Sequence, residues 1–363
     1  YSDLFYSGGF VMIKFFQKSE TEKYIIIKIL FIKITFKKKS LLDTIVWWIP
    51  IKSLRNKIRY LLNNISVKEH NKKVLEFVKN YKILFVEIET HNRCNGDCPF
   101  CPVSVGNDIR KYKQMSIELF TKIINDFSSM NYDGIFSLYS NNECLLDKRM
   151  PIFFKMAKEK LPNAYHIIFT NGSVLTVDLL KEIFPYLDAI GIDNYNDNYE
   201  LNPNVKEVYE FLQENKEYQD KVKIIMRLKN EVITNRAGQS PNKKGKIKTL
   251  KKLCVLPFCQ FVIRPDGKIS LCCNDSYGKM TLGDLNNQTV SEIWNSDIYM
   301  QIRKLSIKGR KYLNMCKFCD YDESSTNHIN RVYESLVLKG GIKEVQRKIM
   351  INIPNEIRRK NEN

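Results

Sequence analysis

Three cysteines with a short, fixed spacing are the residues of this chain whose types could do chemistry. Cys94, Cys98 and Cys101 form a C-x3-C-x2-C pattern in a chain of 363 residues that contains ten cysteines. Thiolates are the usual protein ligands of iron-sulfur clusters, and a four-iron cluster normally takes four of them. Three thiolates on one loop would leave one iron with an open coordination position. The pattern therefore predicts a cluster that can bind a ligand at iron.

Four further cysteines could form a second site nearer the C-terminal end. They are Cys254, Cys272, Cys316 and Cys319. Between the first two, residues 261–264 and 268–271 flank a Pro-Asp-Gly sequence, and Asp-Gly favours a tight turn, so a hairpin is predicted. Two well-separated cysteine pairs also fit a tetrahedral zinc site, which stays open as an alternative here.

A helix is expected to return the last cysteine pair to this hairpin. We expect Ser291 to cap it, because serine is a preferred residue at helix N-termini. Its apolar residues recur at roughly helical spacing: Ile293, Trp294, Ile298, Ile302 and Leu305. The roles of Cys259 and Cys273 are left open, since either could replace a neighbouring ligand or be a buried thiol.

The segment between the two cysteine sets alternates strand and helix patterns. Strands are predicted at 83–88, 134–140, 165–169, 189–192 and 222–228, and helices at 116–130, 149–161, 176–187 and 205–218. This alternation indicates an α/β fold with a parallel sheet. No sixth strand is evident in 230–252, where Gly, Pro, Asn and Lys dominate. We expect an open barrel with its site at the carboxyl ends of the strands.

A cysteine loop that follows a buried strand and has Phe100 before its last cysteine resembles the radical SAM superfamily. The resemblance implies a partial (β/α) barrel in which a 4Fe-4S cluster binds S-adenosylmethionine and cleaves it reductively to a 5'-deoxyadenosyl radical, which abstracts hydrogen from a substrate. It also assigns three residues to cofactor binding: Phe100, Glu143 in SNNECLLD, and Asn171 in FTNG. An exposed loop acid and a plain turn are the alternatives for the last two. The catalytic residue is unknown.

The second cysteine set resembles the SPASM or twitch extension of such enzymes. This implies one auxiliary 4Fe-4S cluster held by Cys254, Cys272, Cys316 and Cys319. Relatives with one auxiliary cluster include dehydrogenases of carbohydrate alcohols, so a carbohydrate or nucleotide-sugar substrate is expected first and peptide maturation second. A flavodoxin or ferredoxin would donate the electron. The rival from a different class is a zinc-binding structural protein or a nucleic-acid-binding protein.

Composition adds little to this assignment. The formal charge of +18 comes from 58 basic and 40 acidic residues, but the lysines are spread through the chain, which disfavours nucleic-acid binding. A cytoplasmic location is expected, with peripheral membrane contact through Trp47 and Trp48 as an option. We expect a basic N-terminal segment over 1–78, partly of strands, the radical SAM core over 79–245, the auxiliary cluster domain over 246–325 and a basic helical tail over 326–363.

Overall fold

The structure is a computed structural model. It describes residues 16–20, 24–29, 32–37, 52–77, 79, 82–243 and 248–322. The chain divides into two compact units, residues 1–67 and 68–363. In the first unit, β1 (Phe16–Glu20), β2 (Tyr24–Ile29) and β3 (Ile32–Lys37) form an antiparallel sheet, as the alternation of lysine with apolar residues predicts. The predicted interfacial tryptophans and the basic tail lie outside the described residues.

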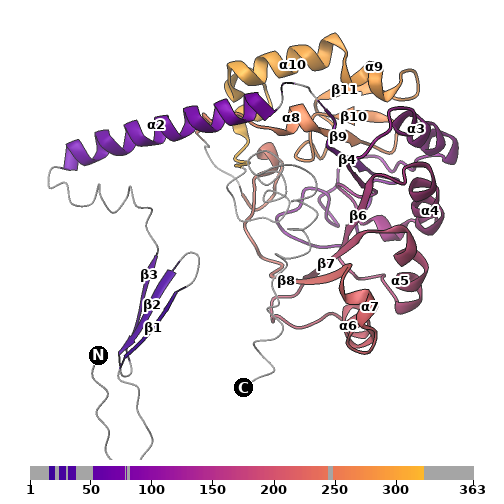
Figure 1. The fold of residues 1–363 in the computed structure, drawn as a ribbon, viewed down its shortest axis with the longest axis horizontal. Helices are drawn as coiled ribbons and strands as arrows, with labels where there is room; N and C mark the ends of the chain where they lie inside the picture. Colours follow the sequence, from indigo (N-terminus) through magenta and orange to yellow (C-terminus); the bar gives the residue numbers. More distant parts are fainter. Residues whose placement is uncertain are drawn as a thin grey trace, which may run out of the picture. The chain divides into compact units, whose positions relative to one another are not determined.

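The second unit is built on an eight-stranded sheet of order β11-β10-β9-β4-β5-β6-β7-β8 (Figure 1). The strands are β4 (Phe85–Ile88), β5 (Ile135–Ser137), β6 (Tyr165–Thr170), β7 (Ala189–Tyr195), β8 (Val222–Arg227), β9 (Gln260–Ile263), β10 (Lys268–Ser270) and β11 (Thr281–Asp284). The five predicted core strands are confirmed as β4 to β8. Each pairs in parallel with the next, and the sheet does not close, so the predicted open α/β barrel is confirmed.

The sixth parallel strand comes from the predicted hairpin. The hairpin is confirmed as β9 and β10, which pair antiparallel. Strand β9 also pairs in parallel with β4, with Phe261 opposite Val86. The sequence shows no sixth strand in 230–252, which would follow β8. The sixth parallel strand is β9 instead, and it lies beside β4, at the opposite end of the five core strands. Sequence periodicity cannot show this, because strand pairing across nearly two hundred residues is a tertiary property.

Helices cover one face of the sheet. In Figure 1, α3 (Ile117–Ser129), α4 (Met150–Lys160), α5 (Val177–Ile183) and α6 (Pro203–Glu214) follow one another along that face. The shorter helices are α7 (Lys216–Gln219), α8 (Leu256–Cys259), η2 (Cys144–Leu146), η3 (Phe184–Tyr186), η4 (Arg236–Gly238), η5 (Arg310–Tyr312) and η6 (Cys316–Phe318). Helix α2 (Lys52–Phe77) crosses the division between the units, and its Asn71 accepts a 2.7 Å hydrogen bond from the backbone of Leu253.

The single helix predicted after Ser291 is wrong, because the segment forms two helices. Helix α9 (Val290–Trp294) begins at Thr289, whose side chain and that of Glu292 form a reciprocal capping box. Helix α10 (Asp297–Lys308) begins at a second cap, Ser296. Ser291 thus lies inside the first turn of α9. Two cap residues close together allow the chain to start a new helix, which apolar spacing alone does not reveal.

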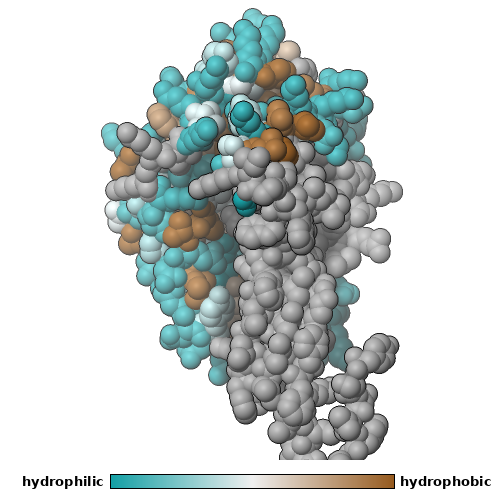
Figure 2. All heavy atoms as spheres, turned by 90° about the vertical axis from the view of Figure 1, so that its left-hand side faces the viewer, coloured by the Kyte–Doolittle hydropathy of each residue, from teal (hydrophilic) through white to brown (hydrophobic). Residues whose placement is uncertain are grey.

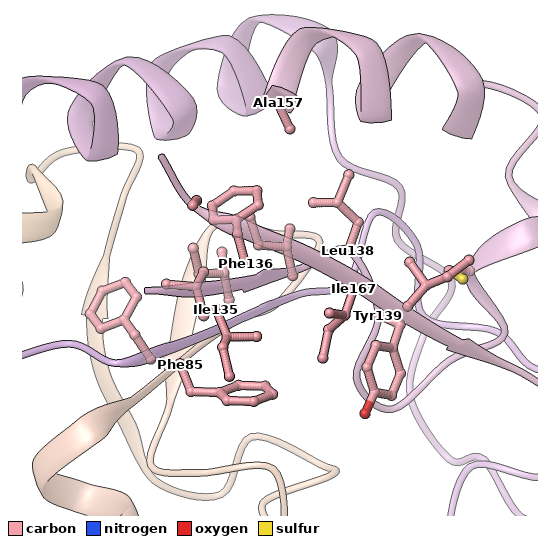
Figure 3. Close-up of a cluster of buried hydrophobic side chains, with 14 of the residues drawn as sticks. Phe85, Ile135, Phe136, Leu138, Tyr139, Ala157 and Ile167 are labelled. Atoms are coloured by element: carbon pink, nitrogen blue, oxygen red, sulfur yellow. The ribbon is translucent and has the colours of Figure 1, made fainter. Parts of the chain in front are cut away.

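The apolar core lies between the sheet and its helices. Figure 3 shows Phe136 and Leu138 pointing toward Ala157 of α4. Tyr139 points to the opposite side, and its hydroxyl is directed away from the labelled apolar side chains (Figure 3). This alternation follows from the two-residue period of extended chain. It places Tyr139 on the inner side of the sheet, where the cysteine loop also lies.

The part of the described surface that Figure 2 shows is mostly hydrophilic. On the face in Figure 2, apolar side chains of the described residues form small groups separated by hydrophilic ones. Among the described residues, no helix has the length and hydropathy needed to cross a membrane.

Candidate active site

A cavity lies where β4 to β8 end at their carboxyl sides. It contains about 1180 Å³ of empty space, counted out to its opening, and the three cysteines of the first set line it. Burial raises the pKa of the Cys94 and Cys98 thiols to about 12, so both are neutral until a metal displaces their protons. All ten cysteines are free. Three thiols on one loop line one cavity. This is the donor set expected for a four-iron cluster that has one iron without a protein ligand.

A buried ion-pair network holds the cysteine loop. Arg110 donates to Glu89 at 2.9 Å and to Asp108 at 3.0 Å, and it also donates to the carbonyls of Asn92 and Asn141. Glu89 is 1% exposed. These contacts tie the two ends of the loop to the loop after β5. Arginine suits this position because its guanidinium can bond several acceptors at once.

Glu143 and Asn171 lie on two neighbouring loops and both line the cavity. The Glu143 carboxylate accepts hydrogen bonds from Thr170 Oγ1 at 2.7 Å and from the backbone N–H of Asn171 at 2.8 Å. Asn171 Nδ2 donates to Asn95 of the cysteine loop at 2.9 Å. Burial raises the pKa of Glu143. Glu143 is 2% exposed, so the alternative of an exposed loop acid does not fit.

Phe100 contacts a group of residues that line the cavity. The sequence does not reveal the role of this group in the site. The Phe100 ring lies 5.6 Å from that of Tyr195, and the Arg227 guanidinium lies 5.3 Å from the same Tyr195 ring. Arg227 pairs with Asp193 at 3.5 Å. Burial alone would lower the pKa of Arg227, but Asp193 and its other partners outweigh this and raise it, so the arginine stays charged. In the sequence, Asp193 follows the fourth predicted strand and Arg227 lies on the fifth, and these positions favour a solvated or structural role over a ligand contact.

Another part of the cavity lining comes from Arg236, near the end of the core, and from Cys273, after the core. Arg236 Nη1 donates to the carbonyl of Cys273 at 3.0 Å, and Asn141 Nδ2 donates to the same oxygen at 3.2 Å. Arg236 and Ala237 both have positive φ, 49° and 51°, which is rare for residues other than glycine. Such backbone strain is frequent at functional sites. Cys273 lines this cavity, a position that the sequence left open.

Two polar groups in the cavity wall have no partner. Tyr139 Oη and Asn142 Nδ2 are buried and make no hydrogen bond in the described part of the chain. Both residues line the cavity. Buried polar groups are nearly always satisfied, so an unpaired pair facing a cavity marks where a polar ligand would bind. In the sequence Tyr139 gives no functional signal, and Asn142 stands out only as part of the SNNECLLD stretch that contains Glu143.

The four cysteines of the second set line a second, smaller cavity, with about 320 Å³ of empty space up to and including its opening. Burial raises the pKa of Cys316 to about 12, and the nearby Arg310 guanidinium opposes that rise. Cys259 is not part of this lining; its Sγ lies 3.5 Å from the carbonyl oxygen of Val255. The predicted set is thus brought together, and Asn274 and Tyr321 belong to the walls of both cavities.

An open parallel barrel with a three-cysteine loop after its first strand, followed by a four-cysteine cavity, defines a radical SAM enzyme with an auxiliary cluster domain. Family models agree: residues 88–236 match the radical SAM superfamily, and residues 254–320 match SPASM, an iron-sulfur cluster-binding domain. The chain belongs to the radical SAM superfamily and carries a C-terminal SPASM domain. Membership implies three kinds of cofactor: S-adenosylmethionine, the 4Fe-4S cluster that binds it, and auxiliary iron-sulfur clusters in the SPASM domain.

Individual relatives are similar to most of this chain. The S-adenosyl-L-methionine-dependent 2-deoxy-scyllo-inosamine dehydrogenase of Niallia circulans is 28% identical over 237 residues, which are 65% of this chain and 92% of that protein. The crystal structure of BtrN in complex with AdoMet and 2-DOIA is 26% identical with a TM-score of 0.57, covering 67% of this chain and 95% of that one. Streptococcus suis SuiB bound to precursor peptide SuiA is 11% identical with a TM-score of 0.41, covering 84% and 95%.

Proposed function

We propose that this enzyme dehydrogenates a secondary alcohol of a cyclitol or sugar. The relative from Niallia circulans is a dehydrogenase of an amino-substituted cyclitol, and the BtrN complex shares the fold at 26% identity. A nucleotide sugar belongs to the same substrate class. Oxidation of an alcohol by hydrogen abstraction leaves one electron that must be removed. The enzyme therefore needs a one-electron acceptor beside the substrate.

The shared wall between the two cavities is the observation that carries this proposal. Asn274 and Tyr321 face the main cavity on one side and the four-cysteine cavity on the other. Cys94, Cys98 and Cys101 would hold the first cluster, Phe100, Glu143 and Asn171 would bind S-adenosylmethionine, and Cys254, Cys272, Cys316 and Cys319 would hold the auxiliary cluster. When bound, these groups supply a 5'-deoxyadenosyl radical and a one-electron acceptor.

The polar side chains of the main cavity suit a substrate rich in hydroxyl groups. Tyr139 Oη and Asn142 Nδ2 are free to form hydrogen bonds, and Arg236 adds a positive charge to the lining of the same cavity. A ligand pocket needs only a few well-placed polar groups to orient its ligand. A flavodoxin or ferredoxin would donate the reducing electron. The ten free cysteines suit the reducing cytoplasm.

The test is anaerobic reconstitution with iron and sulfide, followed by assays with 2-deoxy-scyllo-inosamine and a panel of cyclitols, sugars and nucleotide sugars. We expect 5'-deoxyadenosine and a ketone product in equal amounts from one member of the panel. Deuterium at the oxidised carbon should appear in 5'-deoxyadenosine. Cleavage of S-adenosylmethionine without any ketone, or with modification of an added peptide, would reject the proposal.

A variant tests whether the auxiliary cluster accepts the electron of the substrate. Replacing Cys316 and Cys319 by alanine should remove about four irons, because a four-iron cluster normally needs four thiolates. The variant should still cleave S-adenosylmethionine, since the first cluster is untouched, and its ketone yield should fall at least about tenfold. Full ketone yield without the auxiliary irons would contradict the proposed electron acceptor.

A further inference from the structure

Two carboxylates, one on β4 and one directly after it, have different surroundings. Glu89 forms an ion pair with Arg110 at 2.9 Å. Glu87 is 2% exposed, and no cation of the described residues forms an ion pair with it. Its hydrogen-bond partners are neutral: Ser140 Oγ donates to Oε2 at 2.6 Å, and Gln260 Nε2 donates to Oε1 at 2.7 Å. A buried carboxylate with neutral donors can take up a proton more readily than one held by arginine.

Ser140 connects this carboxylate to the cavity. Ser140 lines the main cavity, half-buried, whereas Glu87 lies behind it. The serine hydroxyl can donate to Glu87 and accept from a cavity ligand at the same time. A hydroxyl group of a bound substrate would thus reach the buried carboxylate through a single intervening oxygen.

The second oxygen of the Glu87 carboxylate is held by Gln260, a residue of the predicted auxiliary cluster domain. Gln260, fully buried on β9, donates to Glu87 and accepts a 3.0 Å hydrogen bond from the backbone N–H of Cys273. Cys273 follows Cys272, which lines the four-cysteine cavity. The carboxylate is therefore positioned by the same strand and turn that carry this predicted cluster ligand. The proton and the electron of the substrate would therefore both leave toward the side of the cavity that borders the four-cysteine cavity.

We propose that Ser140 and Glu87 form a proton relay that accepts the hydroxyl proton of the substrate; this inference rests on the proposed dehydrogenation. The carbinol C–H bond breaks homolytically, and its hydrogen atom goes to the 5'-deoxyadenosyl radical. The O–H bond breaks heterolytically: its proton passes to Ser140 Oγ as the Ser140 proton passes to Glu87. The remaining electron goes to a one-electron acceptor of the iron-sulfur class, leaving a ketone.

The electrostatics of the site support this role. Burial raises the pKa of Glu87 from 4.5 to about 7, while the hydrogen bonds from Ser140 and Gln260 and the charge of Arg236 oppose the rise. The charged or titratable groups that face Glu87 are Glu89 after β4, Arg236 on η4, Tyr139 after β5 and Cys273 after β10. A group with a pKa near the working pH is the most effective general base.

The test compares wild-type enzyme with Glu87→Gln and Ser140→Ala, using reconstituted full-length protein and the panel member that yields ketone. Ser137→Ala is the matched control, because its hydroxyl is buried on β5 and donates to the backbone of Ile167, away from the cavity. We expect wild-type ketone formation to rise with pH through about 7. Glu87→Gln should lose this inflection and slow ketone formation about a hundredfold, while 5'-deoxyadenosine is still produced.

A second readout does not depend on turnover. Infrared difference spectra of cluster-free protein across pH should show one protonated carboxyl group that titrates near 7 in wild type and in Ser137→Ala. The band should be absent in Glu87→Gln. Loss of the hydroxyl donor in Ser140→Ala should move the titration to higher pH, because that hydrogen bond lowers the pKa of Glu87. A wild-type spectrum without such a group would overturn the relay.

The outcomes separate the relay from the proposed function. If wild-type enzyme makes no ketone from any panel member, the dehydrogenase proposal fails and the relay falls with it. If wild type makes ketone but Glu87→Gln keeps its rate and pH profile, the relay alone fails. If Glu87→Gln does not fold, Ser140→Ala decides: an unchanged ratio of ketone to 5'-deoxyadenosine overturns the relay.

Discussion

At the scale of single residues, the two cysteine sets face different surroundings although their chemistry is the same. The first set lines a cavity open enough for a ligand, next to the unpaired Tyr139 hydroxyl. The second set lines a smaller cavity whose wall also contains apolar residues such as Leu256 and Met315. An accessible position beside three thiols suits a cluster that binds a ligand, and a smaller cavity with four thiols suits one that carries an electron.

Replacing one cysteine of the first set should separate the two clusters experimentally. Cys98→Ala should lower the iron content from about eight to about four, because it removes one of only three ligands. The paramagnetic resonance signal that S-adenosylmethionine perturbs should disappear, while the other cluster signal stays. Cys144→Ala is the control, since Cys144 is fully buried and lines neither cavity. Equal iron in the two variants would contradict the assignment.

Glu87 also predicts a pH dependence of stability. Its pKa is raised from 4.5 to about 7 in the folded chain. A carboxyl group with a raised folded pKa contributes stability below its unfolded pKa, and that contribution is lost as pH rises through the folded value. The shift corresponds to about 3 kcal/mol in the free energy of unfolding.

Chemical unfolding at pH 4.5 and above pH 7 checks this prediction. We expect the difference in unfolding free energy between wild type and Glu87→Gln to fall by about 3 kcal/mol between the two conditions. Taking the difference removes the contributions of other titrating groups. A difference that does not change with pH would show that Glu87 titrates alike in the folded and unfolded chains.

At the scale of elements, the segment after the hairpin depends on its caps. Thr289 and Glu292 form a capping box at the start of α9, whereas Ser291 lies within its first turn and is not the cap. Thr289→Ala should therefore lower the free energy of unfolding by about 1 kcal/mol, the usual cost of losing an N-cap. Ser291→Ala should change it by less than about 0.5 kcal/mol, as for an ordinary surface substitution. Thermal unfolding of both variants distinguishes them; a larger loss in Ser291→Ala would support the single helix.

At the scale of the whole molecule, the radical SAM core and the cluster domain share one sheet. Strand β9 pairs with β4, and its Phe261 is fully buried, with its ring 6.1 Å from that of Phe127 on α3. A core without β9 would expose the edge of β4 and this apolar surface. Exposed, unpaired strand edges favour aggregation.

A chain that ends after Lys252 should therefore fail to fold into a core that binds the first cluster. Expression, limited proteolysis and iron content of the truncated chain measure this. The full-length Cys316→Ala and Cys319→Ala variant is the control, because it loses the auxiliary ligands but keeps β9. A truncated chain that is protease-resistant and retains about four irons would show that the core folds independently.

The sequence by itself determined the chemistry of this protein. Ligand type and spacing depend only on neighbouring residues, so Cys94, Cys98 and Cys101 could be predicted from the sequence to form a cluster loop. The same holds for the five strands β4 to β8, because their apolar runs and turn residues are local signals. The hairpin of β9 and β10 was also predictable, because its Asp-Gly turn is local.

Only the tertiary structure decided which residues complete the site. The placement of β9 beside β4, the shared wall of Asn274 and Tyr321, and the contact of Ser140 with Glu87 join segments that are far apart in the chain. Glu87 shows the reason most clearly. In the sequence it is one polar residue in a buried strand, and its capacity to accept a proton depends on the partners and the burial that folding brings to it.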